Sequence, residues 1–231
     1  MKVHVLIPAA GAGRRMGADV NKQYLVLADK PILAHTIELF EQHPSIDNII
    51  LIAPADEMTF VRDDIVNRYQ FTKVRQIVAG GAERQDSVRN GLMASGAAAD
   101  DVVLIHDGVR PLLPTAMIDE IIETAAREGA ALVAVPAKDT IKVVQDNKVV
   151  KTPDRSSIWL AQTPQAFRYQ LIASAHEKAY NENYQATDDA QLAEWLGKPV
   201  TIVRGSYRNL KITTPEDLHL AESFHKGNAE D

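Results

Sequence analysis

The chain has 231 residues, 45% hydrophobic and 24% charged, and this composition predicts one large core in a single domain over residues 1–231. The absence of cysteine excludes a disulfide framework, a thiolate metal site and a cysteine nucleophile, and it suits a reducing cytosol. The net charge of −6 argues against a nucleic-acid-binding surface, and no apolar run approaches the length of a membrane span. We therefore expect a cytoplasmic protein with neither a nucleic-acid nor a membrane partner.

The first predicted element is a buried strand over Val3–Ile7, which leads into a glycine-rich loop over Ala9–Gly17. Gly11 and Gly13 let the backbone turn tightly and bring its N–H groups against a ligand, because neither carries a Cβ atom. Three basic residues accompany the loop: Arg14, Arg15 and Lys22. Glycines combined with these charges favour a phosphate-binding loop.

Two known phosphate-binding motifs fit this loop poorly. In a dinucleotide fingerprint the third glycine would come one residue before Gly17, and an acidic residue would end the second strand, where this chain has Pro54. A Walker loop would end in Gly-Lys-Ser or Gly-Lys-Thr, which is missing here. An ordinary strand-to-helix turn with solvated arginines is the remaining alternative.

Strand-like and helical patterns alternate along the first two thirds of the chain. Strands are predicted over Val3–Ile7, Asn48–Ala53, Val74–Ala79, Val102–Ile105 and Ala131–Val135. Helices are predicted over Ile32–Gln42, Asp56–Tyr69, Arg84–Ser95 and Thr115–Glu128. This order predicts an α/β fold with a mostly parallel sheet covered on both faces, whose ligands bind beyond the carboxyl ends of the strands.

Two further segments follow predicted strand ends. Gly80 and Gly81 precede a helix whose N-terminus offers free N–H groups to an anion, although a simple turn with Ser87 as a helix residue is equally compatible. Asp107 follows the next strand and is a good ligand for Mg²⁺ held on phosphate oxygens, whereas an Asp107–Arg110 pair that only stabilises the turn is the alternative. The adjacent His106 is expected to end the strand and orient Asp107 rather than to act as an acid or base.

The pattern changes over Lys138–Phe167, which is predicted to be an extended arm centred on residues 138–160. Strand-like runs over Thr140–Gln145 and Lys148–Thr152 flank a turn at Asp146 and Asn147. The apolar residues of such a hairpin would gain burial from a second subunit, so we expect two chains to exchange arms in a symmetric homodimer. A hairpin folded back on its own sheet is the alternative.

The motifs together resemble a known enzyme family over almost the whole chain. They are PAAGAGRRMG with NKQY, GGAERQDSVRNGL, HDGVRP, KDTIK, DR before IW, QTPQAF, TDD and NLKITTPEDL. Their order is similar to that in the cytidylyltransferases of the non-mevalonate isoprenoid pathway. The resemblance implies a Rossmann-like nucleotidyltransferase fold, a homodimer joined through the arm, and transfer of a cytidylyl group from CTP to methylerythritol phosphate with release of pyrophosphate.

The resemblance also implies roles for individual residues. The implied catalytic residues are Arg15, Lys22, Arg155 and Lys211. The implied nucleotide-binding residues are Pro8, Ala9, Ala10, Gly11, Gly13, Arg14, Gly81, Ser87 and Asp107. The implied sugar-phosphate-binding residues are Asp107, Arg110, Thr140, Arg155, Thr163 and Lys211, with Thr140 and Arg155 coming from the neighbouring subunit. Asp107 is also implied near Mg²⁺, in direct contact or not, while Ala82 stands where some members carry an acidic residue.

The residue types agree with this chemistry. A substrate phosphate has a second pKa near 6, so at neutral pH it is largely a dianion that needs no general base to attack the α-phosphate. The transition state needs arginine, lysine and Mg²⁺ to offset charge on the departing pyrophosphate. A ribitol phosphate cytidylyltransferase shares nearly every motif and stays open as an alternative, as does a protein that binds CTP without turning it over.

Overall fold

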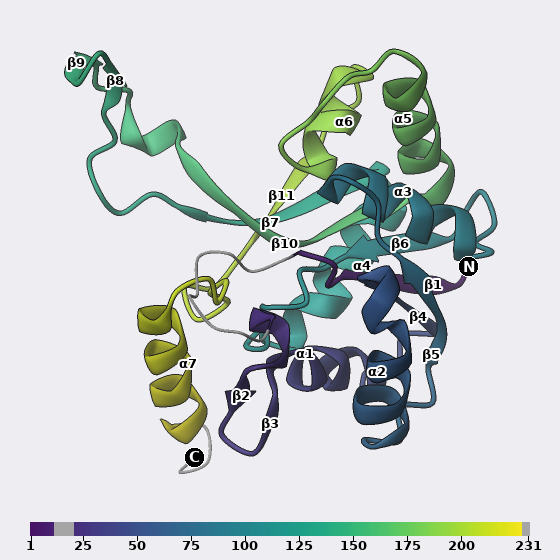
Figure 1. Cartoon of the computed structure of the whole chain (residues 1–231). Helices are drawn as coiled ribbons and strands as arrows, with labels where there is room; N and C mark the ends of the chain where they lie inside the picture. The colour runs from purple at the N-terminus through teal and green to yellow at the C-terminus, as the bar shows by residue number, and fades with distance from the viewer. Residues whose placement is uncertain (12–20, 228–231) are drawn as a thin grey trace.

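A seven-stranded sheet forms the centre of the folded molecule (Figure 1). The computed structural model describes residues 1–11 and 21–227. Across the sheet, the strands are β11 (Thr201–Arg204), β7 (Ala130–Pro136), β10 (Trp159–Arg168), β6 (Val102–Ile105), β1 (Val3–Pro8), β4 (Asn48–Ala53) and β5 (Val74–Ala79). All neighbouring pairs are parallel except those of β10, which runs antiparallel to both β6 and β7. The predicted α/β fold with a mostly parallel sheet is confirmed.

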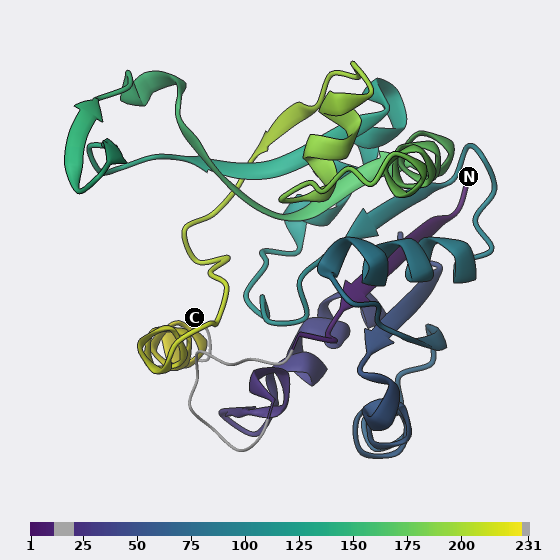
Figure 2. The same cartoon turned by 45° about the horizontal axis from the view of Figure 1, so that its top comes forward.

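Helices cover both faces of the sheet (Figure 2). One face packs against α1 (Ile32–Glu41), the helical stretch that contains α2 (Met58–Phe60), and α4 (Ala116–Glu128). The other face packs against α3 (Arg84–Ala94), α5 (Tyr169–Asn181) and α6 (Asp189–Trp195). The alternation of a strand explains this division, because Val5 and Ile7 of β1 enter the first core while Leu6 enters the second.

A smaller apolar cluster lies beside the sheet, under α7 (Pro215–Gly227). It joins Leu27, Ile32 and Val109 to Ile212 and Ala221. Leu27 belongs to β2 (Val26–Leu27), which pairs with β3 (Lys30–Pro31) in a separate short sheet. The cluster therefore fastens the C-terminal helix to the segments that follow β1 and β6. Within the described part of the chain, no helix is long and apolar enough to cross a membrane.

Two predicted elements differ from the structure. The helix predicted over Asp56–Tyr69 consists of a 3₁₀ turn (Ala55–Glu57), the short α2 and a π-helix (Val61–Asn67). Hydrogen bonds across five residues, such as Arg68 N–H to the Asp63 carbonyl, give the last part its wider turns. The first strand, predicted over Val3–Ile7, extends one residue further to Pro8, which lies in register with Ile52.

The arm predicted over residues 138–160 projects from the sheet, and β8 (Val143–Gln145) and β9 (Lys148–Lys151) lie at its far end (Figure 1). Asp146 and Asn147 between them have φ angles of 49° and 60°, as expected of a tight hairpin turn. The valines of both strands are exposed. The hairpin does not fold back on its own sheet, so that alternative is wrong. The extended arm predicted up to Phe167 ends earlier, because the chain from Trp159 onward belongs to β10, a strand inside the seven-stranded sheet.

Gly129 ends α4 with a φ of +93°, a conformation that L side chains rarely adopt. We expect Gly129→Ala to lower the free energy of unfolding by about 1–2 kcal/mol, because the new Cβ strains the backbone. Crowding is not the cause, since that Cβ would lie 3.5 Å from Leu171, an ordinary contact. Urea unfolding followed by circular dichroism measures the difference, and an unchanged midpoint would contradict the assignment of strain.

Candidate active site

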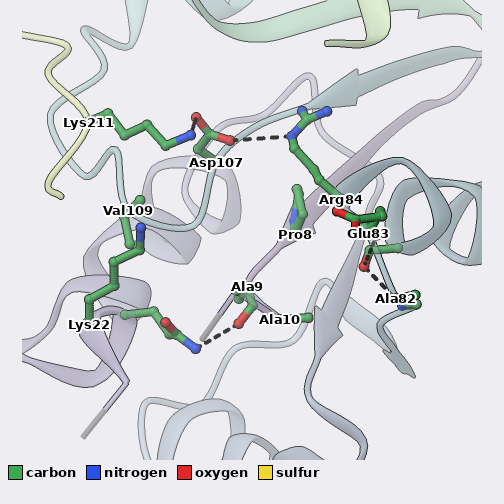
Figure 3. A pocket seen from close by; sticks show the side chains of 14 residues that line it. Pro8, Ala9, Ala10, Lys22, Ala82, Glu83, Arg84, Asp107, Val109 and Lys211 are labelled. Atoms are coloured by element: carbon green, nitrogen blue, oxygen red, sulfur yellow. Dashed lines mark hydrogen bonds and ion pairs between the residues drawn. The ribbon is translucent and has the colours of Figure 1, made fainter. Parts of the chain in front are cut away.

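A cavity of about 440 Å³ lies where β1, β5 and β6 end, beside the first turn of α3 (Figure 3). The described residues that line it are Pro8, Ala9, Ala10, Gly11, Lys22, Gln23, Gly81, Ala82, Glu83, Arg84, Ser87, Asp107, Val109 and Lys211. In the sheet β1 lies between β4 and β6, so the strand order reverses beside it. Ligands of open α/β sheets bind at the carboxyl ends of strands next to such a reversal.

The turn between β5 and α3 approaches the loop after β1 so closely that glycine is required. A Cβ on Gly80 would lie 2.4 Å from the Cβ of Ala10, and one on Gly81 would lie 2.3 Å from the Cβ of Asp86. The Gly80 N–H also donates to the Ala53 carbonyl at 2.8 Å, which extends the strand pairing up to the turn. Gly80 thus lets the start of α3 approach the first loop, and Gly81 lets the turn pack against α3 itself.

The hydroxyl group of Ser87 fixes this turn from inside α3. It accepts a hydrogen bond from the Gly81 N–H and donates one to the Glu83 carbonyl, both at 3.0 Å. Glu83 is the N-cap of α3, and its own N–H donates to the Asp86 carboxylate at 3.1 Å. The helix therefore begins at a defined residue, with its N-terminus at the cavity.

Asp107 is the buried carboxylate of the cavity and lies among three cations. Its Oδ2 is 3.0 Å from the Lys211 ammonium and 3.2 Å from the Arg110 Nε, and its Oδ1 is 3.9 Å from the Arg84 Nε. Burial raises the pKa of the Asp107 carboxyl, but Lys211, Arg110 and Arg84 outweigh burial and hold that pKa well below its usual range. Asp107 is therefore ionised, and the 40% exposed side chain of Lys211 can still meet a ligand.

His106 and Thr163 hold the backbone of Asp107 in place. The His106 Nε2 lies 3.0 Å from the Arg110 carbonyl, and its Nδ1 lies 3.1 Å from the Thr163 hydroxyl, which accepts the Asp107 N–H at 3.1 Å. Burial lowers the pKa of His106 to about 4, so the ring is neutral at pH 7. Because a carbonyl only accepts, Nε2 carries the proton and Nδ1 accepts from Thr163. His106 orients its neighbours, as expected from the sequence.

The fully buried Asn209 joins the segment before Lys211 to the rest of this network. Its side-chain amide donates to the Thr163 carbonyl at 2.8 Å and to the Gln162 side chain at 3.2 Å. Its carbonyl accepts a hydrogen bond from Arg110 at 2.7 Å. Lys211 therefore reaches the cavity from a segment that Asn209, two residues before it, binds to β10.

Lys22 also lines the cavity and begins a short 3₁₀ turn (Lys22–Tyr24) that is held by contacts on two sides. The buried amide of Gln23 donates to the Ala9 carbonyl at 2.7 Å. Tyr24 donates to the Glu57 carboxylate at 2.8 Å, and burial together with Glu57 raises the pKa of the phenol above its usual value. These contacts tie the turn that carries Lys22 to the first loop and to the segment after β4.

Comparison with known proteins assigns the chain to a family. The model of the family described as 2-C-methyl-D-erythritol 4-phosphate cytidylyltransferase matches residues 3–226. The chain belongs to this cytidylyltransferase family. A 2-C-methyl-D-erythritol 4-phosphate cytidylyltransferase of Syntrophotalea carbinolica is 60% identical over 224 residues, which are 97% of this chain and 96% of the relative. One of Geotalea uraniireducens is 59% identical over 227 residues, 98% and 97% of the two chains.

Solved structures agree with the family assignment. The crystal structure of 4-diphosphocytidyl-2C-methyl-D-erythritol synthase from Anaerococcus prevotii superposes with a TM-score of 0.84 at 33% identity, covering 97% of this chain and 96% of that one. The resemblance inferred from the motifs and the expected nucleotidyltransferase fold are both confirmed.

The cavity of this cytidylyltransferase contains most of the site residues expected from the sequence. Those that line it are Pro8, Ala9, Ala10, Gly11, Lys22, Gly81, Ser87, Asp107 and Lys211. Gly13, Arg14 and Arg15 lie outside the described residues. Thr163 and Arg110 lie behind Asp107 and contact it. Thr140 and Arg155 do not line the cavity of their own chain, and Arg155 donates to the Lys138 carbonyl at 2.6 Å on the arm.

Sequence reasoning missed four lining residues: Gln23, Glu83, Arg84 and Val109. Arg84 carried the clearest signal, because it is the first residue of a helix that follows a glycine pair at a strand end. Gln23 carried none, since its partner is a backbone carbonyl 14 residues away.

Gly80→Ala would place a methyl group 2.4 Å from the Cβ of Ala10 and push the first loop away from α3. We expect this variant to lose about 1–3 kcal/mol of stability, as overpacked variants do, together with most of its affinity for a cavity ligand. Thermal melting and nucleotide titration measure the two losses.

The matched control is the exchange variant Gly80→Ala/Ala10→Gly, which restores a single methyl group between the two loops. It should recover most of the melting temperature. If Gly80→Ala alone melts and binds like the unchanged protein, the close approach of the two loops is not a constraint.

Proposed function

We propose that this cytidylyltransferase transfers the cytidylyl group of CTP to 2-C-methyl-D-erythritol 4-phosphate and releases pyrophosphate. The family match over residues 3–226 and the printed names of its relatives support this reaction. The observation that carries the proposal is the cavity itself, in which Lys22 and Lys211 face a helix N-terminus and an ionised Asp107. Such a cavity suits a polyphosphate whose charge changes during reaction.

In the proposed reaction, a phosphate oxygen of the acceptor attacks the α-phosphorus of CTP. The bond from that phosphorus to its bridging oxygen breaks, and the electron pair leaves with pyrophosphate. No proton has to be removed, because the attacking phosphate is already largely a dianion at neutral pH. The buried, neutral His106 fits a mechanism without a general base. Catalysis then rests on positioning and charge, with Arg15, Lys22 and Lys211 on the triphosphate.

The nucleotide is proposed to lie along the first loop and the start of α3. Pro8, Ala9, Ala10, Gly11, Gly13 and Arg14 would surround it from the first loop. Gly81 and Ser87 would contribute to the cytosine and ribose pocket, where Ser87 acts by fixing the Gly81 backbone. With Ala82 at the position that is acidic in some members, the base would be read through backbone groups.

Mg²⁺ is the proposed cofactor, held mainly on phosphate oxygens beside Asp107. Within residues 1–11 and 21–227, no three His, Cys, Asp or Glu side chains are grouped to hold a metal by themselves. The ionised Asp107 fits an ion of this kind, because among the described residues its Oδ1 has only the more distant Arg84 as a neighbouring cation. When bound, the ion would offset charge on the phosphates.

A homodimer joined through the arm is proposed to complete the sugar-phosphate site. The exposed Val143, Val144, Val149 and Val150 of the arm offer apolar surface to a second copy. Arg155 and Thr140 of one subunit would then reach the acceptor in the other, alongside Asp107, Arg110 and Thr163. We further propose that the chain is a single domain and that it works in the cytoplasm.

The experiment that tests the reaction is pyrophosphate release with Mg²⁺, in which CTP, UTP, ATP and GTP are each combined with methylerythritol phosphate and ribitol phosphate. We expect turnover with CTP and methylerythritol phosphate alone, and a loss of about a hundredfold in kcat for Lys211→Ala. A preference for ribitol phosphate would change the assigned acceptor but keep the reaction type. No pyrophosphate release in any combination would contradict the proposed reaction.

Arg15→Ala and Arg155→Ala should separate the two halves of the reaction. We expect Arg15→Ala to lower kcat by roughly a hundredfold, about 3 kcal/mol, because it removes a contact to the leaving phosphates in the transition state. Arg155→Ala should instead raise the KM for the sugar phosphate. Steady-state kinetics with each substrate varied measures both effects, and equal losses of CTP binding alone would contradict this division.

Mixing the Lys211→Ala and Arg155→Ala variants, at a sugar-phosphate concentration far below the KM of the Arg155 variant, tests whether the arm serves the other subunit. In a mixed dimer, one subunit carries Lys211→Ala and the other carries Arg155→Ala. If each site takes Lys211 from its own subunit and Arg155 from the other, one of the two sites has both residues intact. Random assembly would therefore restore about a quarter of full activity, because half the dimers are mixed and half their sites are whole. Activity after co-refolding measures this. No gain over the separate variants would show that Lys211 and Arg155 serve the same subunit's site.

A further inference from the structure

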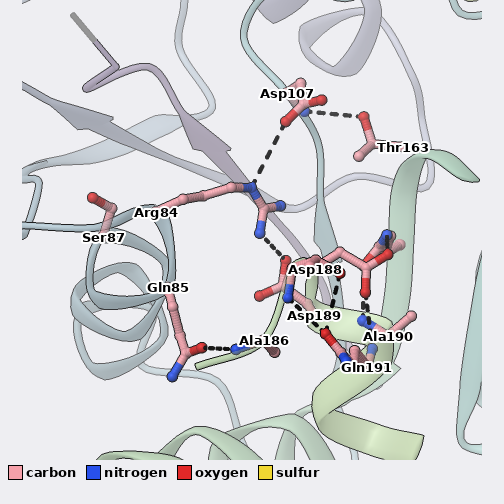
Figure 4. Close-up of polar contacts among 12 residues, drawn as sticks. Arg84, Gln85, Ser87, Asp107, Thr163, Ala186, Asp188, Asp189, Ala190 and Gln191 are labelled. Carbon is pink, nitrogen blue, oxygen red and sulfur yellow. Dashed lines mark hydrogen bonds and ion pairs between the residues drawn. The ribbon is translucent and has the colours of Figure 1, made fainter. Parts of the chain in front are cut away.

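Four ionisable side chains run from the cavity into the interior: Asp107, Arg84 of α3, Asp189 of α6 and His176 of α5. Figure 4 shows the first three. The first is Asp107, whose Oδ1 lies 3.9 Å from the Arg84 Nε. The Arg84 Nη1 lies 2.7 Å from the Asp189 Oδ2, and the Asp189 Oδ1 lies 3.1 Å from the His176 Nε2. Arg84 thus lies between two carboxylates, one on the cavity and one 1% exposed in the interior.

Asp189 does not cap α6, so helix capping does not explain its burial. The preceding residue, Asp188, is the N-cap of α6 and accepts the Gln191 N–H at 2.9 Å. Asp188 also accepts a hydrogen bond from the Gln165 side chain at 2.9 Å, which ties α6 to β10. Buried ion pairs are poor stabilisers compared with apolar packing, so a carboxylate placed here needs another reason.

The contacts of Arg84 supply that reason. Its guanidinium lines the cavity, and the nearer of its two carboxylates is Asp189. Burial raises the pKa of the Asp189 carboxyl, but Arg84 and His176 outweigh burial and keep the group ionised. Without the charge of Asp189, the nearest anion for the guanidinium would be the Asp107 Oδ1. This is the oxygen that Lys211 and Arg110 leave open.

We propose that Asp189 is a positioning residue that holds the Arg84 guanidinium on the cavity wall, away from the Asp107 carboxylate, and so keeps one Asp107 oxygen open for the reaction. This role rests on the proposed function, because it concerns the Asp107 that takes part in cytidylyl transfer. Asp189 itself lies outside the cavity and touches no substrate.

The test is a double-mutant cycle with Asp189→Asn and Arg84→Gln, scored by kcat, by CTP affinity from calorimetry and by melting temperature. We expect Asp189→Asn to lower kcat about tenfold, since Arg84 then pairs with Asp107. In the Arg84→Gln background the same substitution should change kcat less than about twofold, because the competing guanidinium is gone. Glu194→Gln is the matched control, since it removes a carboxylate charge at an exposed position of the same helix α6, and its kcat should stay within about twofold.

Two results would overturn the proposal: an unchanged kcat in Asp189→Asn, or the same tenfold loss in the Arg84→Gln background. Should Asp189→Asn fail to fold, Arg84→Lys replaces it. A lysine lacks the Nη1 atom that reaches Asp189, so its ammonium is left to pair with Asp107 and its kcat should fall about tenfold. An unchanged value would count against the role. The unchanged enzyme must first release pyrophosphate from CTP and methylerythritol phosphate. If the unchanged enzyme releases no pyrophosphate, the proposed function is refuted. If it is active and the variants are unaffected, only the role of Asp189 is refuted.

Discussion

Charge compensation at Asp107 is the interaction on which the arrangement of the cavity depends. A carboxylate this deeply buried is stable only with cations beside it, and its three cations come from three separate parts of the chain. Arg84 begins α3, Arg110 follows β6 in the same loop as Asp107, and Lys211 follows β11. The Lys211 pairing therefore fixes the segment after β11 against the loop after β6, whereas Arg84 stays 3.9 Å from Asp107 and lies closer to Asp189.

The local elements around the cavity follow from sequence patterns, but β10 does not. Strands such as Asn48–Ala53 are continuous apolar runs between turn residues, which is typical of a strand buried on both faces. The centre of β10 instead contains Pro164 and the buried polar side chains of Gln162, Thr163 and Gln165. A proline in a run of polar residues argues against a central strand. Only the tertiary partners of these residues, His106, Asn209 and Asp188 among them, explain them.

The site shows the same division. A short stretch of sequence is enough to recognise the glycines at strand ends, the acidic Asp107 and the basic Lys22 as site residues. Gln23 and Asp189 are not, because each acts on a group far away in the sequence, the Ala9 carbonyl and the Arg84 guanidinium. Arg110 was expected at the substrate, yet its guanidinium bonds Asp107 and the Asn209 carbonyl, so the structure gives it at least a supporting part.

The antiparallel direction of β10 has a consequence for the arm. Because β7 and β10 are neighbours in the sheet, the two ends of the arm leave it at paired positions, Pro136 opposite Trp159. The arm is thus an insertion into a hairpin that is already closed by its own hydrogen bonds. Its length and sequence can change without moving the register of either strand, since closing a loop at fixed ends costs little more when the loop grows. The arm and the fold of the sheet are thereby separable, so a change in the arm leaves the pairing of β7 with β10 intact.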